Sequence, residues 1–201
     1  VPESGFDAIS SIGLTEHIGR ANYPAYFSFL FGKLRAEGRM LNHTITRPSD
    51  DWKSHFRRSF ITRYVFPDGE LSGPAQVMTG MNSAGFEIRH EENLREHYAL
   101  TLKHWCENLE ENWDAAVAEG GLAVARVWRM YMAASRLGFD IDFVQLHQVL
   151  GVKLGPGGSS GMPLRPGFDR APTFAGPPAP SVPRRRSRAV GPAPSVPRRR
   201  P

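Results

Sequence analysis

The chain has 201 residues, 40% of them hydrophobic and 10% aromatic, which is enough for one domain with a packed core. Its net charge of +5 comes from the segment after Leu154, which holds nine arginines and one acidic residue. The body before it therefore carries about −3, and its charge does not indicate a nucleic-acid-binding protein. The single cysteine, Cys106, excludes a disulfide framework and a cysteine-rich metal site, and no apolar stretch approaches the ~20 residues of a membrane span. We therefore expect a cytoplasmic protein that, because it starts at Val1 rather than Met, has lost a preceding segment.

The beginning of the chain predicts a β-α-β unit. Residues 6–13, FDAISSIG, are short, apolar and end at a glycine, as buried strands of parallel sheets do. Apolar positions then recur at three- and four-residue spacing, which predicts a helix that begins at Asn22 and ends at Gly38. Residues 39–46, RMLNHTIT, form the next predicted strand. Short connections between these elements favour two parallel strands.

The rest of the body predicts a continued α/β fold. Residues 51–73 are aromatic and basic, and we expect an irregular or helical excursion over the sheet's edge. The elements expected after it are a short helix at 74–83, a strand at 85–94, long helices at about 97–119 and 122–137, and a closing strand at 143–154.

The C-terminal segment has a different composition from the body. It holds twelve of the 17 prolines, and the stretch PAPSVPRRR at 178–186 recurs at 192–200. Such a segment cannot bury enough apolar surface to order itself, so we expect 1–155 to form the domain and 156–201 to be disordered. Its arginines are suited to anionic lipid or nucleic acid, although the repeat is equally compatible with no function.

Two polar residues follow the predicted strands where a ligand site is expected. Glu16 lies just past the end of the first strand, and His43 lies near the end of the second. The carboxyl ends of adjacent parallel strands are about 5 Å apart, and ligands bind in the crevice beyond them. A carboxylate that faces an imidazole is suited to proton abstraction or to the binding of a small oxyanion.

The same two residues also have a purely structural interpretation. Strands of βα units often end in polar residues, and a histidine within a strand is often a hydrogen-bonded core residue. The residues alone leave both interpretations open. The other histidines share no ligand spacing, so no metal site is predicted from His17, His55, His90, His97, His104 and His147.

Several longer motifs resemble one enzyme family. They are SIGLTEHIG, NYPAYF, LNHTIT, FITRYVFPDGEL, HYALTLKHW and VWRMYMAASRLGF. In this order and with these gaps they resemble the cyclopropane-fatty-acyl-phospholipid synthases, which include the mycolic-acid cyclopropane synthases and related S-adenosylmethionine-dependent methyltransferases. The resemblance covers about residues 6–154. It implies a partial Rossmann-like class I methyltransferase sheet, with the later strands only and with added helices.

The resemblance also implies a reaction and a site. The methyl group of S-adenosylmethionine goes to the cis double bond of an unsaturated phospholipid acyl chain, and loss of a proton closes a cyclopropane ring. A bicarbonate ion assists the proton removal. Because the acyl chains belong to membrane phospholipids, the resemblance also implies a protein peripheral to the inner face of the membrane. Carried over to this chain, the bicarbonate ligands would be the Ile12 backbone, the Glu16 carboxylate, the His43 imidazole and the Tyr98 hydroxyl. Gly13 would contact the cofactor.

Other positions implied by the resemblance are less direct. Ser135 aligns with a cysteine that some members carry as a catalytic residue, but a serine cannot supply the same thiolate. An acyl tunnel, or ordinary helix packing, would account equally well for Trp105, Trp113, Trp128, Met130, Tyr131 and Met132. A related methyltransferase that adds a methyl branch instead of a ring fits the same motifs.

The chain also departs from the family pattern. The glycine-rich turn that binds the cofactor, the acid that holds its ribose and the first three strands have no counterpart in this sequence. We therefore expect the chain alone to bind the cofactor weakly or not at all. We also expect an unpaired strand edge and uncovered apolar surface. An inactive remnant that binds anionic lipid or nucleic acid through its tail is the alternative.

Overall fold

The computed structural model describes residues 3–50, 59–165 and 167, and these form the basis of all that follows. One compact unit runs from Val1 to Met162, and a second begins at Pro163. The predicted disorder of residue 166 and of 168–201 lies outside the described residues. Residues just beyond the predicted boundary at 155 still belong to the first unit, where Arg39 Nη2 donates to the Gly161 carbonyl oxygen at 3.0 Å.

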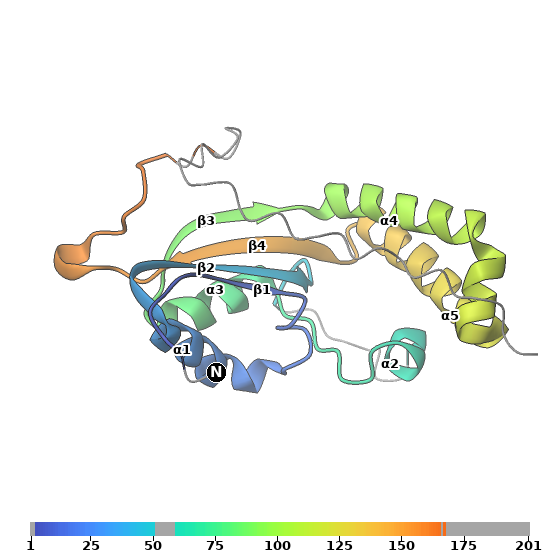
Figure 1. The fold of residues 1–201 in the computed structure, drawn as a ribbon, viewed down its shortest axis with the longest axis horizontal. Coiled ribbons are helices and arrows are strands. Elements are labelled where there is room, and N and C mark those ends of the chain that lie inside the picture. The colour runs from blue at the N-terminus through green and yellow to red at the C-terminus, as the bar shows by residue number, and fades with distance from the viewer. Residues whose placement is uncertain (1–2, 51–58, 166, 168–201) are drawn as a thin grey trace, which may run out of the picture. The chain divides into compact units, whose positions relative to one another are not determined.

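Four strands form one open sheet in the order β1-β2-β4-β3 (Figure 1). Their bounds are Phe6–Ile12 for β1, Leu34–Thr46 for β2, Glu87–Asn93 for β3 and Gln145–Val152 for β4. β1 and β2 are parallel, as the β-α-β prediction required. β4 inserts between β2 and β3 and runs antiparallel to both, an arrangement that the sequence pattern did not specify.

Helix α1, Tyr23–Lys33, ends earlier than predicted. The prediction that it reaches Gly38 is wrong, because residues 34–37 are drawn into the sheet as the start of β2. There the Glu37 N–H donates to the Lys153 carbonyl oxygen at 2.7 Å, and Glu37 takes a left-handed φ of 61°. Asn22 precedes the helix without capping it, since its side chain donates to the Ile18 carbonyl oxygen instead.

Helices α1 and α3, Pro74–Ser83, cover one face of the sheet (Figure 1). The predicted bounds of α3 are confirmed, and the excursion before it holds a short helix α2, Phe60–Tyr64. The core between these helices and the sheet excludes water, because each of its side chains is at most 4% exposed. Aromatic and aliphatic residues both contribute to it. It is made by Tyr23, Phe27, Leu34, Met40, Val77, Met81, Phe86 and Val149.

Helices α4, Arg95–Glu111, and α5, Trp113–Asp140, form a pair that extends from one end of the sheet (Figure 1). The predicted division of this region near 119–122 is only partly right. The pair separates at Asn112, and a second break follows at Gly121, where φ is 79° and ψ is 155°. A smaller core cluster joins the pair to the sheet through Ala99, Leu102, Phe139 and Leu146. Among the described residues no helix has the length and apolar character needed to cross a membrane.

The other face of the sheet is far less covered. In β2, positions 40, 42, 44 and 46 are buried against the helical face, whereas Leu41, His43 and Ile45 on the opposite side are only partly buried. In β1 only Ile9 and Ser11 are shielded, and Ile12 is 66% exposed. Within the described chain, β1 pairs with β2 alone, so its outer edge carries no strand partner.

Candidate active site

A tight loop after β1 brings the first site residue under the helical pair. Gly13 has φ of 64°, and its N–H donates to the His43 carbonyl oxygen at 2.9 Å. A side chain at Gly13 would meet no atom within 4 Å, so the left-handed backbone, and not space, favours glycine here. The loop then places Thr15 and Glu16 in buried positions, 0% and 6% exposed.

The Glu16 carboxylate is held at one oxygen and unpaired at the other. Oε1 accepts the backbone N–H of Ile45 at 2.7 Å, two residues beyond His43 on β2. Oε2 is buried and has no hydrogen-bond partner. A buried carboxylate oxygen without a partner is costly in a folded protein, so such atoms mark places where a ligand or an ion completes the bonding.

His43 is oriented by a neighbour on β4. The two residues face each other across the β2–β4 ladder, and Gln148 Nε2 lies 3.1 Å from His43 Nδ1. Because an amide nitrogen can only donate, Nδ1 accepts, and the ring proton is placed on Nε2. Burial lowers the pKa of His43 from its ordinary 6.5, and the nearby Glu16 charge opposes this shift. The imidazole is therefore neutral near pH 7, with one N–H to donate.

Tyr98 reaches the same region from α4. Its ring packs edge-on against Phe139 at 4.9 Å and against Trp105 at 5.8 Å between ring centroids. Burial raises the pKa of Tyr98, and the charges of Tyr131 and Glu16 raise it further. Tyr98 is thus a protonated donor at neutral pH within electrostatic range of the Glu16 carboxylate.

Tyr131 is a second tyrosine at this place, contributed by α5. The Ser135 side chain, one helical turn further along, lies close enough to its hydroxyl to affect the pKa of Tyr131. Burial raises the pKa of Tyr131, the Ser135 side chain lowers it, and Glu16 raises it. Ser135, which aligns with a family cysteine, is half-buried next to Tyr131 on the same helix, and its catalytic role stays a prediction.

Aromatic contacts tie α5 to the loop that holds Glu16. The Tyr131 ring packs against Phe66 at 5.6 Å, and Phe66 packs in turn against His17 at 5.2 Å between centroids. The segment after Phe66 is also bound to the loop, because the Glu70 N–H donates to the Glu16 carbonyl oxygen at 2.8 Å. These contacts join α5 to the loop after β1.

The structure brings most of the predicted residues together. The Glu16 charge raises the pKa of His43, Tyr98 and Tyr131, so the carboxylate lies within electrostatic range of all three side chains. Ile12 is the last residue of β1 and pairs with His43. Met130 does not belong with them, since it is 59% exposed while Tyr131 beside it faces the site.

Two contributors were missed from the sequence. No local sequence pattern indicates that Gln148 contacts His43, because only the antiparallel insertion of β4 makes the two residues partners. Tyr131 was grouped with possible tunnel residues. The four-residue spacing between Tyr131 and Ser135 on one helix was the available sign that the two side chains interact.

Comparisons with known proteins agree with this fold. The antiparallel strand β4 lies between β2 and β3, and this sheet order places the chain among Rossmann-like methyltransferases. A family model, mycolic acid cyclopropane synthetase, matches residues 1–149. The chain therefore belongs to the mycolic acid cyclopropane synthetase family of S-adenosylmethionine-dependent methyltransferases.

Individual relatives support the same assignment. A probable fatty acid methyltransferase of Mycobacterium tuberculosis is 57% identical over 166 residues, which are 83% of this chain and 39% of that protein. The cyclopropane synthase MmaA2 of the same organism superposes with a TM-score of 0.69 at 25% identity, covering 75% of this chain and 56% of that one. Mycolic acid cyclopropane synthase CmaA1, in complex with SAH and CTAB, gives a TM-score of 0.68 at 29% identity over the same shares.

The chain spans only part of each relative. The share is about two-fifths of the fatty acid methyltransferase and just over half of the two synthases. The described residues of this chain include the loop after β1 but no glycine-rich turn between a strand and a helix, the element that cradles a nucleotide-like cofactor.

Proposed function

We propose that this chain provides the proton-handling part of a methyltransferase that forms a cyclopropane ring on the cis double bond of an unsaturated phospholipid acyl chain. The observation that supports this most directly is that Glu16 Oε2 is buried and has no hydrogen-bond partner. Three side chains within electrostatic range of Glu16 could donate a hydrogen bond to a bound ion or relay a proton, namely His43, Tyr98 and Tyr131. An apolar substrate offers no polar group for that oxygen. A small polar ion that can donate one hydrogen bond would complete it.

A bicarbonate ion fits these residues chemically. Its O–H could donate to Glu16 Oε2, while its charged oxygens could accept from His43 Nε2–H and from the Tyr98 hydroxyl. In the reaction, S-adenosylmethionine supplies a methyl group and bicarbonate accepts the proton that leaves the acyl chain. Glu16, His43 and Tyr98 then have the role of holding that acceptor in place. The Ile12 backbone, at the end of β1, is proposed as a further ligand.

The aromatic residues around the carboxylate are suited to excluding water. Tyr98 packs against Phe139 and Tyr131 packs against Phe66, so aromatic rings from α4, α5 and the segment after α2 lie in the region of Glu16. A positive charge that develops on an apolar chain is stabilised most by fixed groups in a dry site. We propose that Ser135 acts here as a positioning residue, since it lies one helical turn from Tyr131 and affects the pKa of its hydroxyl.

We also propose that this chain is an incomplete enzyme by itself. The uncovered face of the sheet and the free edge of β1 are where further strands and helices would pack. We expect the chain alone to bind S-adenosylmethionine weakly or not at all, and Gly13 to contact the cofactor only when the fold is completed. The arginine-rich tail remains a predicted binder of anionic surfaces, outside the described residues.

A chimera tests the proposal directly. Residues 3–154 replace the matching segment of the fatty acid methyltransferase that is 57% identical. We expect the chimera to transfer labelled methyl groups to unsaturated phospholipid, and to slow when bicarbonate is removed from the buffer and recover when it is restored. The chain alone serves as the comparison and should be inactive. Methyl transfer by the chain alone, or a chimera indifferent to bicarbonate, would contradict the proposal.

Addition of a methyl branch is the second candidate. The similarity to a probable fatty acid methyltransferase supports methyl transfer to an acyl chain, which is compatible with a branch as well as with a ring. A ring and an unsaturated branch have the same mass, so proton NMR of the chimera's product distinguishes them. Upfield ring methylene protons indicate a cyclopropane, and vinylic protons indicate a branch.

A further inference from the structure

The outward side of α5 carries hydrophobic residues that are largely exposed in the described chain. Leu122, Met130 and Leu137 are 45%, 59% and 57% exposed, and Ile141, directly after the helix, is 64% exposed. Met130, the exposed Ala133 and Leu137 follow one side of the helix at three- and four-residue steps, and Arg126 lies on the same side between Leu122 and Met130. The opposite side of the same helix holds the site residues and the core. A helix that is apolar on both sides is normally covered on both sides.

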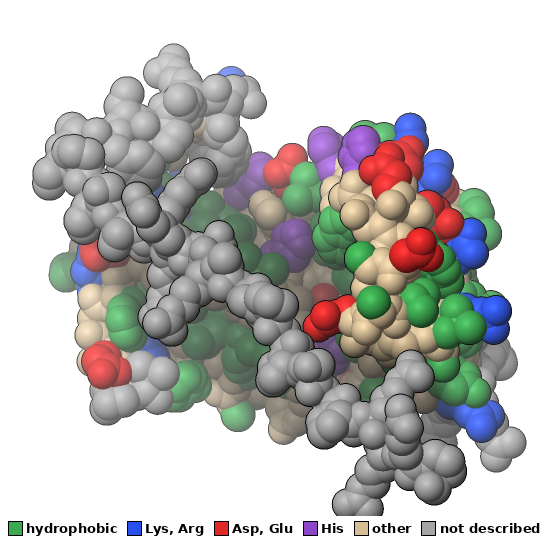
Figure 2. Space-filling model, turned by 45° about the vertical axis from the view of Figure 1, so that its right-hand side comes forward, with side chains coloured by type: hydrophobic (Ala, Val, Ile, Leu, Met, Phe, Trp, Pro, Cys, Tyr) green, Lys and Arg blue, Asp and Glu red, His purple; other side chains and the backbone are tan. Residues whose placement is uncertain are grey.

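Basic residues flank this apolar stripe. Between residues 122 and 141 the exposed charged side chains are Arg126, Arg129, Arg136 and Asp140, three cations against one acid. Arg129 is already held by Glu110, with bonds of 2.5 and 2.7 Å to its two carboxylate oxygens. Figure 2 shows hydrophobic and basic side chains next to one another along the projecting helical pair. Apolar residues bordered by arginine are typical of helices that lie on a membrane surface.

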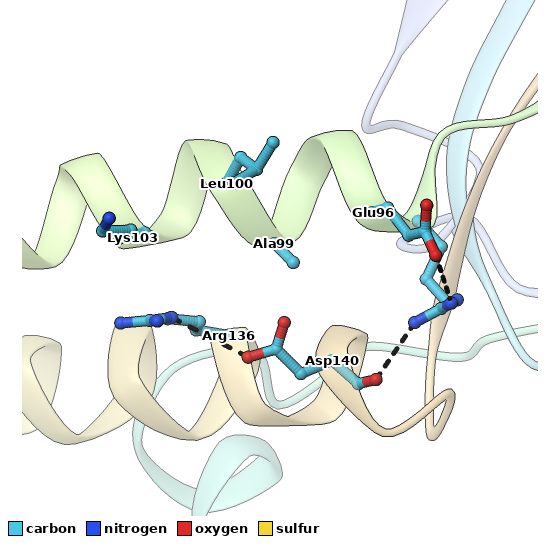
Figure 3. Close-up of a pocket in the computed structure, with 7 residues that line it drawn as sticks. Glu96, Ala99, Leu100, Lys103, Arg136 and Asp140 are labelled. Atoms are coloured by element: carbon cyan, nitrogen blue, oxygen red, sulfur yellow. Dashed lines mark hydrogen bonds and ion pairs between the residues drawn. The ribbon is translucent and has the colours of Figure 1, made fainter.

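A groove beside the stripe adds cations that are only loosely paired. It measures about 300 Å³ and lies between α4 and α5, where Lys103 and Arg136 approach from opposite helices (Figure 3). The ion pair of Arg136 with Asp140 measures 3.8 Å, and that of Lys103 with Glu107 measures 3.9 Å. Pairs this long and exposed contribute about 0–1 kcal/mol, so both cations can exchange these partners for a phosphate.

We propose that this outer surface, the stripe of α5 with the adjoining groove, docks on a phospholipid bilayer that contains anionic headgroups. The apolar side chains enter the interface between headgroups and acyl chains, and the cations contact lipid phosphates. Tyr131 and Ser135, on the opposite side of the same helix, would then lie one helix diameter from the lipid. The functional role of this docking rests on the proposed lipid substrate, but the test of the docking itself requires no catalytic turnover.

A probe at the stripe can report docking separately from the arginine-rich tail. The full chain, with Cys106→Ser, receives Leu137→Cys and a polarity-sensitive fluorophore, and is mixed with vesicles of phosphatidylglycerol and phosphatidylcholine. A matched chain carries the probe at Phe29→Cys, which is 51% exposed on α1. We expect a blue shift at position 137 and none at position 29. The absence of a shift at 137, or equal shifts at both positions, would overturn the proposal.

Partition measurements then test the two kinds of contact. Met130→Ser combined with Leu137→Ser should lower the vesicle partition coefficient of the full chain about tenfold, and Phe29→Ser should not change it. Arg126→Gln with Arg136→Gln should reduce the preference for anionic over phosphatidylcholine vesicles about fivefold per charge. If the serine variants instead lower the molecular mass in lipid-free light scattering, a second copy covers this surface and membrane docking is wrong. Methyl transfer by the chimera is measured separately, so each proposal can fail alone.

Discussion

The two faces of the sheet differ in what they bury. Against α1 and α3, β2 presents Met40 at 0% exposure within a continuous aromatic and aliphatic core. On the opposite face, His43 is only partly buried and is bonded to Gln148. One face therefore supplies the stability of the fold, and the other supplies titratable groups at a place where the packing is incomplete. This division of roles is common where a site is placed at the ends of strands.

The largest expected effect lies on the packed face. Phe27→Ala removes a fully buried ring and should cost about 3–5 kcal/mol of the free energy of unfolding, measured by urea denaturation. Ile12→Ala on the open face should change it by less than about 0.5 kcal/mol, because that side chain is 66% exposed. Similar costs at the two positions would mean that the faces are not packed differently.

Glu16→Gln should separate function from stability. In the chimera we expect methyl transfer to fall about a hundredfold, because the buried carboxylate that holds the proton acceptor is lost. The glutamine can still accept the Ile45 N–H, so the free energy of unfolding should change by less than about 1 kcal/mol. A loss of activity explained by unfolding would assign Glu16 to structure instead.

Gln148→Leu tests the orientation of His43. Without the amide donor at Nδ1, the ring can carry its proton on either nitrogen, and we expect about a tenfold loss of chimera activity. Nitrogen NMR of the His43 ring should show a mixture of tautomers in the variant and one tautomer in the parent. Lost activity with an unchanged tautomer would exclude a positioning role.

The smallest expected effect is a pH dependence from the packed interior. His147 is 4% exposed, bonds Thr46 at 2.7 Å and lies 3.3 Å from Glu91. Burial lowers the pKa of His147 below its ordinary 6.5, although Glu91 opposes the shift. The unfolded chain thus binds more protons just below pH 6.5, and stability should fall as the pH drops through that range. A Tm a few degrees lower at pH 5.5 than at pH 7.5, and a smaller difference in His147→Gln, would agree.

Local patterns determined much of this protein. Strand and helix periodicity predicted the parallel β1–β2 pair and the bounds of α3, because these depend on neighbours in the chain. The predicted strand ends indicated Glu16 and His43 as a pair, and the family motifs added Tyr98. The catalytic roles of these residues stay predictions.

Only the tertiary structure decided the rest. The alternation in β2 cannot say whether His43 or Thr44 faces the core, because the covering helices make that choice. The insertion of β4 between β2 and β3 pairs Gln148 with His43, although more than a hundred residues separate them in the chain. Helix α1 is shorter than predicted because residues 34–37 join the sheet as the start of β2. The exposed stripe of α5 likewise becomes visible only once the other side of the helix is buried. Contacts between distant segments are set by how whole elements pack, and no short stretch of sequence contains that information.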